Sequence, residues 1–511
     1  MKLLFVSPVS ACFELENQSP YYAPEPYSVF LDGKLQFQRD TNVFSLFHLR
    51  PNTAYCVRAG EQELHFTTKA VTAAVSVRDF GAAGDGVQDD TAAIQTAILC
   101  LPEGGLLHFP EGTYRTAPLT LKSHITLSMG QGAVLLGETD RARYPVVPGR
   151  IQDIFTGEDR LFGTFEGNAM AMYQALLFAE HARDITIAGC GTVDGNAQNS
   201  DFWRVFRELP VARPRLLFFH ECQDICIHGI TVQNSASWQI HPFFSRDIGL
   251  YDLQINAPKV SPNTDAIDPE SCDNVEIVGC RFSVGDDCIA IKSGKIDLGR
   301  TYRRSANHHT IRNCLMANGH GAVTLGSEIG AGVDNLSVSQ CWFRGTDRGL
   351  RIKTRRGRGK DCNLDNILFE NIRMENVLTP VAMNMWYNCC DPDRFSEYVW
   401  SREALPVDER TPHLGRFTFR NLTCTGVQVA ACYIDGLPEM PIDQVNFESC
   451  SFTFAPDAKP GKPIMKNFAQ EECRLGLYLD NVRHIRLRGV TLEGQQGEPV
   501  AASHYETLET D

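Results

Sequence analysis

One short apolar phrase recurs through most of this 511-residue chain. Two apolar residues stand two positions apart, and a third apolar residue or a cysteine follows three positions later. Ten copies run from Ile185/Ile187/Cys190 to Ile485/Leu487/Val490, with 23 to 50 residues between successive third positions. Alternation within the phrase predicts strands, and a constant phrase at variable spacing predicts coils of fixed shape joined by variable loops. The pattern favours an all-β parallel β-helix over a sheet whose strands alternate with helices.

Cysteine is frequent at the third position of the phrase, where five of the ten copies carry it. The chain holds 18 cysteines, without the paired spacing of a zinc finger. A disulfide framework is typical of small secreted chains rather than of a chain this long. We therefore expect the cysteines to be small buried residues inside the coils, in the reducing environment of the cytoplasm, and we expect no metal site.

Charge and hydropathy exclude several classes of function. The formal net charge of −14 argues against a nucleic-acid-binding protein. The chain has no run of 18 apolar residues, so it predicts no membrane span, and Met1–Val6 is interpreted as a first strand rather than a secretory signal. Positive charge gathers in residues 344–360, which hold eight Lys or Arg residues and one acid. An anionic substrate would find compensating charge there.

Residues 1–70 are predicted to form a separate small β-sandwich domain, because short β-prone runs alternate with turn residues there. The segment Leu49–Tyr55 resembles the tyrosine corner of fibronectin type III modules, in which the tyrosine hydroxyl bonds to nearby backbone. The resemblance implies a spacer or a binding module, and a plain β-sandwich packed on its neighbour is the favoured interpretation.

Residues 75–511 are predicted to form the β-helix, with a capping helix near residues 90–101. The apolar residues of one helical face are Ile94, Ala97, Ile98 and Leu101. Such a helix suits the open end of a sheet, which must be covered. The acids before it are Asp85, Asp89 and Asp90. We expect them to serve turns and the helix N-terminus rather than a metal ion.

Four short polar motifs each follow a copy of the phrase, in four successive copies. They are Asn263-Thr264-Asp265, Gly285-Asp286-Asp287, Gly319-His320-Gly321 and Arg351-Ile352-Lys353. Equivalent positions on adjacent coils lie ~4.8 Å apart, so the motifs are expected to form one column ~14 Å long on one side of the solenoid. A groove of that length with clustered carboxylates suits a few units of a polysaccharide.

Strand alternation supports this column only in part. Leu350 and Ile352 are expected to point inward, which puts Arg351 and Lys353 outward together. His320 is in phase with Ala322 and Thr324, and these side chains are expected to point outward. Val323 and Leu325 are expected to point inward. Strict alternation would instead bury Asp287, and the same difficulty affects Asp265. A buried unpaired carboxylate is costly, so a bend at Gly285 is expected.

The four motifs, in this order, resemble the signatures of the polygalacturonase family of glycoside hydrolases, glycoside hydrolase family 28. The resemblance spans about residues 75 to 500, with Ala266 where many members have glycine. It implies a right-handed parallel β-helix that hydrolyses α-1,4 galacturonosyl bonds with inversion and without a cofactor. The implied partner is a galacturonate-containing polysaccharide or oligosaccharide, whereas the oligomeric state stays open.

The resemblance also implies roles for individual residues. Asp286 would be the general acid, Asp265 and Asp287 would hold and deprotonate the attacking water, and His320 would assist the acid. Three close carboxylates repel one another, so one of them can keep a proton near neutral pH. Inversion predicts an acid and a base ~6.5–9.5 Å apart. The implied substrate-binding residues are Asn263, Lys292, Glu328, Arg351 and Lys353.

The mode of attack is expected to be exo rather than endo, although both stay open. Gly326-Ser327-Glu328 and the basic run Arg355–Lys360 resemble the bacterial exo-acting branch, and an N-terminal module fits that branch too. Three long insertions would wall off one end of the groove and leave a pocket for a chain end. They are Arg141–Ala175, Ile296–Asn307 and Tyr387–Leu414.

Three other functions compete with this interpretation. A pectate lyase would use the paired aspartates to bind Ca²⁺, would make an unsaturated product and would lose activity with a chelator. A hydrolase of rhamnogalacturonan or of a decorated galacturonan would stay within the same family. A non-catalytic carbohydrate-binding β-helix would bind without turnover, and its binding would not change with Asp286→Asn.

Overall fold

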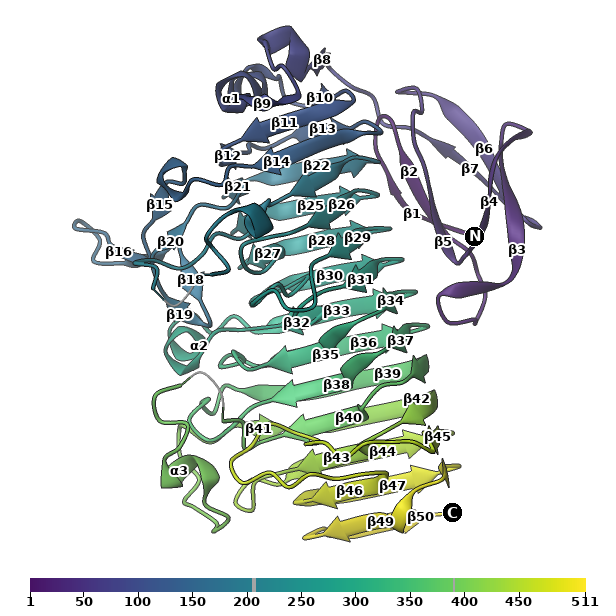
Figure 1. Cartoon of the computed structure of the whole chain (residues 1–511), viewed down its shortest axis with the longest axis vertical. Coiled ribbons are helices and arrows are strands. Elements are labelled where there is room, and N and C mark those ends of the chain that lie inside the picture. Colours follow the sequence, from purple (N-terminus) through teal and green to yellow (C-terminus); the bar gives the residue numbers. More distant parts are fainter. Residues whose placement is uncertain (205–207, 389–390) are drawn as a thin grey trace.

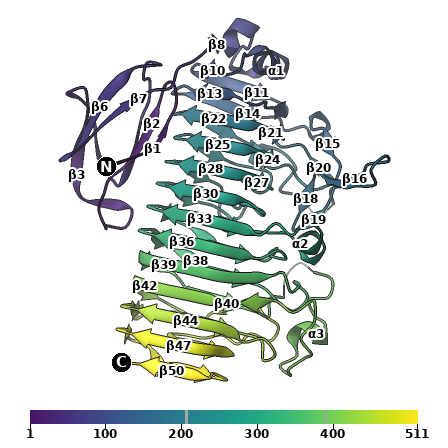
Figure 2. The same cartoon turned by 180° about the vertical axis from the view of Figure 1, so that it is seen from behind.

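Parallel strands stacked coil upon coil make up most of the molecule, and a small antiparallel unit lies along one side of the stack (Figures 1 and 2). This computed structural model describes residues 1–204, 208–388 and 391–511. Each coil adds a strand to up to three parallel sheets, so the predicted all-β parallel β-helix is confirmed. No helix in these described ranges is long and apolar enough to cross a membrane.

The first sheet carries the repeated apolar phrase in exact register from coil to coil. Ile185 pairs with Ile225, Ile225 pairs with Ile248, and the row continues without slippage to Ile485. The first two residues of every copy are buried, which confirms the predicted inward direction. The strands of this sheet are β8 (Ala74–Ser76), β10 (Gly105–Phe109), β13 (Ile125–Met129), β22 (Arg183–Gly189), β25 (Gln223–His228), β28 (Arg246–Tyr251), β30 (Asp273–Val278), β33 (Ala306–Arg312), β36 (Val333–Ser339), β39 (Asn363–Glu375), β42 (Arg416–Val427), β44 (Ile442–Glu448), β47 (Val482–Arg488) and β50 (Thr507–Thr510).

A second sheet follows each bend, and β39 and β42 are long enough to belong to both sheets. Its other strands are β9 (Asp85–Asp89), β11 (Gly112–Thr116), β14 (Ala133–Gly137), β23 (Thr192–Asp194), β26 (Thr231–Gln233), β29 (Gln254–Asn256), β31 (Arg281–Ser283), β34 (Leu315–Met316), β37 (Trp342–Arg344), β45 (Ser451–Phe454) and β48 (Thr491–Glu493). The short strand β41 (His413–Leu414) pairs with the start of β39.

The third sheet holds the polar motifs. Its N-terminal part consists of β12 (Leu119–Thr120), β21 (Leu177–Glu180), β24 (Leu217–His220) and β27 (Ile240–Phe243). Its C-terminal part consists of β32 (Ile289–Ile291), β35 (Gly319–Gly326), β38 (Thr346–Lys353), β40 (Thr379–Asn384), β43 (Ala430–Asp435), β46 (Leu475–Asp480) and β49 (Gln496–Ser503). Bridges from Ile267 to Ile240 on one side and to Ile289 on the other join the two parts.

Cysteines fill part of the interior, with one exception among those of the phrase. The buried third-position cysteines are Cys280, Cys314, Cys341 and Cys450. The expectation is wrong for Cys190, which is exposed. Gly189 before it has φ +134°, whereas Gly229 and Gly279 at the corresponding turns have φ +79° and +73°. Because the turn at Gly189 has a different backbone conformation, the next side chain does not enter the coil.

The predicted helix covers the N-terminal end of the stack as α1 (Thr91–Cys100), after the short 3₁₀ helix η1 (Val77–Phe80), and Figure 1 shows it at the end of the coils. The expected apolar face is buried, with Ile94, Ala97 and Ile98 at 0% exposure. Asp85 and Asp89 accept hydrogen bonds from turn or helix-start N–H groups, as expected. Asp90 instead accepts from the N–H groups of Ala83 and Gly84, so it fixes the preceding turn.

The N-terminal strands form two antiparallel sheets, of strand order β1-β2-β5 and β4-β3-β6-β7. These are β1 (Lys2–Val6), β2 (Ala11–Glu14), β3 (Tyr22–Leu31), β4 (Lys34–Thr41), β5 (Val43–Leu46), β6 (Ala54–Ala59) and β7 (Gln62–Thr67). The Tyr55 hydroxyl accepts a hydrogen bond from Arg50 N at 2.9 Å, the contact expected of a tyrosine corner. The two sheets enclose their own apolar core. A buried ion pair from Glu14 to Arg312 of β33, at 2.8 Å, attaches this unit to the coils.

Short elements of the insertions and of one further loop gather on the side of the stack away from the N-terminal unit (Figures 1 and 2). They are η2 (Arg141–Arg143), β15 (Val146–Val147), β16 (Arg150–Gln152), β17 (Asp159–Leu161), β18 (Thr164–Phe165), β19 (Asn168–Ala169), β20 (Met172–Tyr173), η3 (Ala197–Asn199), α2 (Ile296–Tyr302) and α3 (Glu397–Trp400). This is the side on which the third sheet carries the polar motifs.

Candidate active site

A cavity of about 250 Å³ lies over the third sheet where the four polar motifs meet. Its lining consists of Glu166, Trp238, Asn263, Asp265, Asp286, Lys292, His320, Ser327, Glu328, Arg351, Lys353, Tyr387 and Met465. Eight of the nine predicted site residues are in this lining, and the ninth, Asp287, is bonded to two of them. The sequence motifs, separated along the chain, therefore come together at one place.

Coil register explains why the motifs meet. Ile267, Ile289, Val323 and Leu350 pair in one row across four coils, so the polar residues near them are stacked as well. Leu350 and Ile352 are in the apolar core, and the alternate residues of β38 line the cavity, as predicted. The expectation for Ala322 is wrong, because Ala322 belongs to the buried core. Ala322 and Val323 both lie in that core, so strict alternation fails near the start of β35.

Asp287 is fully buried, and two cations satisfy it. Lys353 Nζ donates to Asp287 Oδ2 at 2.7 Å, and Arg351 Nη1 donates to Asp287 Oδ1 at 2.9 Å. Burial alone would raise the pKa of Asp287, but Lys353 and Arg351 outweigh it and hold that pKa well below its usual range. The preceding Gly285 is required for space, since a Cβ there would lie 2.6 Å from the carbonyl oxygens of Pro258 and Ser261. The buried aspartate thus avoids the cost of an unpaired charge.

Asp265 has the opposite environment. It is 4% exposed, and its Oδ1 has no hydrogen-bond partner within the described part of the chain. Burial raises the pKa of Asp265 well above its usual range, and repulsion by Asp286 and Asp268 adds to this effect. Within the carboxylate cluster, the environment of Asp265 therefore favours the protonated form of the carboxyl group.

Asp286 is the accessible member of the cluster, with 22% of its side chain exposed. His320 Nδ1 lies 3.4 Å from Asp286 Oδ1, and the hydrogen bond to Asp286 raises the pKa of His320. Oxygens of Asp265, Asp286 and Asp287 lie within 4.8 Å of one another. The expected separation of ~6.5–9.5 Å is therefore wrong for this cluster. The reason is the solenoid itself, because neighbouring coils are only ~4.8 Å apart.

A second set of charges lies beside the carboxylate cluster. Lys292 Nζ lies 3.0 Å from Glu328 Oε2 and 3.5 Å from Asp268 Oδ1, and all three side chains are buried. Burial would lower the pKa of Lys292, but Glu328 and Asp268 raise it well above its usual value. Burial raises the pKa of Asp268 to about 8. Lys292 and Glu328, expected to bind substrate, hence form a paired wall of the cavity.

Trp238 is a cavity residue that the sequence interpretation missed. It stands just before β27, level with Asp265 on the next coil, because Ile240 pairs with Ile267. Lys292 Nζ lies 4.4 Å from the Trp238 ring centroid. Alignment of the coils would have identified this position as equivalent to a site aspartate. The other missed residues, Glu166, Tyr387 and Met465, come from loops with no repeated pattern.

Asn263 is held in place rather than free to swing. It has φ +55°, a left-handed conformation that asparagine tolerates, and its Oδ1 accepts a hydrogen bond from Arg213 Nη2 at 2.6 Å. Arg213 is 2% exposed and also donates to two backbone carbonyls. The amide group of Asn263 therefore lines the cavity in a fixed orientation.

The basic residues of β38 and those of the run that follows it have two different environments. Arg351 and Lys353 reach the cavity, whereas Arg355, Arg356 and Arg358 are buried in ion pairs with acids of distant loops. Those acids are Asp391, Asp393 and Glu439. The later arginines hence fix the loops around the site, whereas Arg351 and Lys353 line the cavity itself.

Three insertions meet at Lys295, immediately before α2. Lys295 N donates to Gly167 O at 3.0 Å, and Lys295 Nζ pairs with Asp391 at 2.9 Å. Gly167 also packs against the Glu328 side chain, as a Cβ at Gly167 would lie 2.8 Å from it. The insertions are therefore tied together at the cavity wall on the Glu328 side.

Comparison with known proteins shows similarity to glycosyl hydrolases and to a polygalacturonase. Residues 157–395 match the family model described as glycosyl hydrolases family 28, and residues 74–140 match one described as rhamnogalacturonase A/epimerase, pectate lyase-like. A probable polygalacturonase of Vitis vinifera is 32% identical over 396 residues, which cover 75% of this chain and 75% of that protein.

Two solved structures are also similar. The exopolygalacturonase of Thermotoga maritima is 26% identical with a TM-score of 0.66, and the match covers 83% of this chain and 93% of that one. The family 28 exopolygalacturonase of Yersinia enterocolitica is 20% identical with a TM-score of 0.75, over 99% of this chain and 98% of that one. The second similarity is one of fold, and it includes the N-terminal sheets.

Proposed function

The chain belongs to glycosyl hydrolase family 28 and is a polygalacturonase-like enzyme, and we propose that it removes sugar units from the end of galacturonate chains by inverting hydrolysis. One observation carries the proposal. An accessible carboxylate, Asp286, stands beside His320 at the cavity, next to one buried aspartate whose pKa is raised and another whose pKa is lowered. That arrangement holds an acid and a base within reach of one glycosidic bond.

In this proposal Asp286 protonates the leaving oxygen. Burial, with repulsion by the Asp286 carboxylate, raises the pKa of Asp265 well above its usual range, so the cluster favours a proton beside Asp286. Asp286 is the member that substrate reaches, so it delivers that proton, and His320 steadies its carboxylate through the 3.4 Å contact. Proton transfer by a positioned acid contributes ~10²–10⁴-fold to a rate.

The attacking water is held by Asp265 and Asp287 in this proposal. Two carboxylate oxygens up to ~5.5 Å apart can each accept a hydrogen bond from one water, and the cluster lies within 4.8 Å. Asp287 is ill suited to act as a covalent nucleophile, because Arg351 and Lys353 occupy both of its oxygens. Inversion follows from a direct attack by water, and ¹H NMR of the first-formed anomer tests it. Retention would overturn this part of the mechanism.

The substrate carboxylate is assigned to Arg351 and Lys353. These two cations face one carboxylate, Asp287, so one positive charge is left over for an anionic sugar. The planar guanidinium of Arg351 is suited to a carboxylate, and 13% of this side chain is exposed to the cavity. Asn263 is placed to donate to a sugar hydroxyl from its fixed position.

The exo mode rests on the walls of the cavity. Loop residues Glu166, Tyr387 and Met465 line it together with the motif residues, and a volume of about 250 Å³ is small for a groove that would hold many sugars. The insertions that meet at Lys295 close the side next to Glu328. A chain end fits such a cavity better than the middle of a polymer does.

The test is a time course on saturated galacturonate oligomers, with products separated by size and Asp286→Asn as the control. Monomer or dimer released from the start, and absent with the variant, is expected of an exo-hydrolase. A spread of intermediate lengths would show endo attack and overturn the interpretation of the insertions. No turnover on galacturonate would direct the search to rhamnogalacturonan or a decorated galacturonan as substrate.

A Ca²⁺-dependent lyase is the alternative function that one structural observation favours, since the three aspartates have the spacing of a cation site. Arg351 and Lys353 oppose it, because an ion bound to Asp287 would compete with two cations already paired there. We expect activity to survive a chelator and no unsaturated product to absorb in the ultraviolet. Sugar binding without turnover, unchanged in Asp286→Asn, would instead indicate a non-catalytic β-helix.

We also propose a cytoplasmic location, with imported oligogalacturonides as substrate. The described cysteines are free thiols, and most of them are buried, which suits a reducing compartment. Cell fractionation with an antibody against the chain tests this, and recovery outside the cytoplasm would contradict it.

A further inference from the structure

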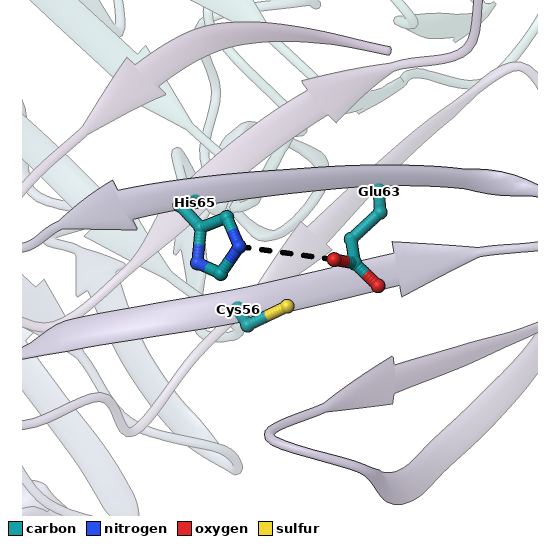
Figure 3. A group of neighbouring side chains, drawn as sticks. All are labelled: Cys56, Glu63 and His65. Carbon is teal, nitrogen blue, oxygen red and sulfur yellow. Dashed lines mark ion pairs between the residues drawn. The ribbon is translucent and has the colours of Figure 1, made fainter.

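Three side chains with metal-binding donor groups meet on the outer face of the N-terminal unit, far from the cavity in sequence. They are Cys56 of β6 and Glu63 and His65 of β7, and Figure 3 shows them facing one another. Cys56 and His65 are direct cross-strand partners, and Glu63 lies two residues from His65 on the same face. Val57 and Phe66 alternate with them and are buried in the core of the unit. The hairpin therefore fixes all three donors on one outward surface.

The spacing of the donor atoms suits a single ion. His65 Nε2 lies 3.7 Å from Glu63 Oε1, and donor atoms of all three residues lie within 4.8 Å of one another. Metal–ligand distances of ~2.0–2.3 Å place the ligand atoms of a tetrahedral zinc site about 3.5 Å apart. Small rotamer adjustments suffice, because the side chains of Glu63 and His65 are 54% and 78% exposed.

The backbone under Cys56 is held in place. Cys56 N donates to Asp32 Oδ1 at 2.9 Å, and Asp32 N donates to Cys56 O at 2.9 Å. Arg58, the cross-strand partner of Glu63, directs its guanidinium over the Phe30 ring at 4.2 Å.

The hairpin group differs from the aspartate cluster in the charges that surround it. These two groups are the candidate cation sites that the described residues contain. In the aspartate cluster, Lys353 and Arg351 already pair with Asp287. Within the described chain, the ion pair of Glu63 is with His65, itself a metal-binding side chain, at 3.7 Å. The hairpin group has lone pairs that can bind a cation, whereas the negative charge of Asp287 is neutralised by Arg351 and Lys353.

From this geometry we propose that Cys56, Glu63 and His65 bind a zinc ion on the surface of the N-terminal unit. A thiolate, an imidazole and a carboxylate are the ligands that Zn²⁺ accepts, and three protein ligands leave the fourth tetrahedral position to water. On binding, the Cys56 thiol loses its proton to solvent, its sulfur bonds to the ion, and the hydrated ion gives up water molecules. No oxidation or reduction takes place. Affinity therefore rises with pH.

The test is a Zn²⁺ titration of the full chain at pH 7.5 against a competing chromophoric chelator. We expect one ion per chain, with at least tenfold weaker binding for Cys56→Ser and for His65→Ala. Matched controls are Cys100→Ser, another non-core cysteine, and Glu61→Gln, an acid of the same hairpin turn. Both controls are expected to bind as the unaltered chain does. Because all four substitutions are at the surface, thermal unfolding is expected to confirm that each variant is folded.

Co²⁺ gives a second, independent readout. A cobalt–thiolate charge-transfer band is expected in the near ultraviolet for the unaltered chain and is expected to be absent for Cys56→Ser. Equal affinity of the unaltered chain and Cys56→Ser would overturn the proposal. Loss of binding in Asp286→Asn would also overturn it, since the ion would then be at the aspartate cluster. The result does not depend on the enzyme activity proposed above.

Discussion

Replacing Asp287 with asparagine separates two roles that this residue combines in the structure. Asn has the same size and keeps a hydrogen-bonding oxygen, but it removes the negative charge that Lys353 and Arg351 approach at 2.7 and 2.9 Å. If Asp287 helps to activate water, kcat is expected to fall by ~10²–10⁴-fold, which is about 3–5.5 kcal/mol in the barrier.

Substrate binding should change in the opposite direction. A galacturonate carboxylate bound beyond Arg351 would lie ~6 Å from Asp287, where two like charges at an effective dielectric constant of ~20 repel by about 3 kcal/mol. Screening by the surrounding charges reduces that figure, so we expect KM to fall by up to ~10-fold rather than to rise. The combined signature is a lower kcat with an equal or lower KM.

The assay is steady-state release of reducing ends from a galacturonate oligomer of defined length. Asp347→Asn, an acid on the same strand outside the cavity, is the matched control and should leave both constants within twofold. Circular dichroism must first show native structure, because two cations lose their buried partner. A tenfold rise in KM with unchanged kcat would refute the reasoning. Asp287 would then serve only to hold Arg351 and Lys353 in position.

Three further outcomes follow from the structure. Asp265→Asn should unfold at a higher temperature than the unaltered chain at pH 8 and show little gain at pH 4. The reason is that a carboxyl group whose pKa is raised on folding destabilises the folded state once the pH exceeds the pKa of that group in the unfolded chain. An equal difference in unfolding temperature at the two pH values would contradict this. Trp238→Ala should raise KM at least tenfold with a smaller change in kcat, since the ring lines the cavity and supports two buried cations; an unchanged KM would place the sugar elsewhere. Arg312→Met should lower the free energy of unfolding by ~3–5 kcal/mol, because Glu14 would be left as a buried charge. Arg420→Met removes an ion pair whose side chains are 41% and 32% exposed, and it should cost less than ~1 kcal/mol in the same denaturation experiment. Equal losses for the two variants would argue against a special role of the Glu14–Arg312 ion pair.

The coil register was predictable because one physical rule generates it. Inward residues that recur two apart in every coil must stack, and the row from Ile185 to Ile485 follows from that rule without exception. The repeated phrase does not extend to the coils of β10, β13 and β50, although Ile125 and Leu508 continue the same row. Those coils lack a full copy of the phrase, and only the pairing itself identifies them.

The active-site residues were predictable as positions, but not as charge states. The coil pattern brings Asp265 and Asp286 together, whereas the raised pKa of Asp265 depends first on burial, then on Asp286 and also on Asp268, which no motif indicates. The basic run shows the same limit. Lys353 is the last residue of β38 and faces the cavity, while Arg355, two residues later, is 4% exposed and pairs with acids more than thirty residues away. Residues of the same charge in one basic run therefore have different roles before and after the end of the strand. Periodicity sets the direction of a side chain inside a strand, whereas long-range contacts between loops set it after the strand ends.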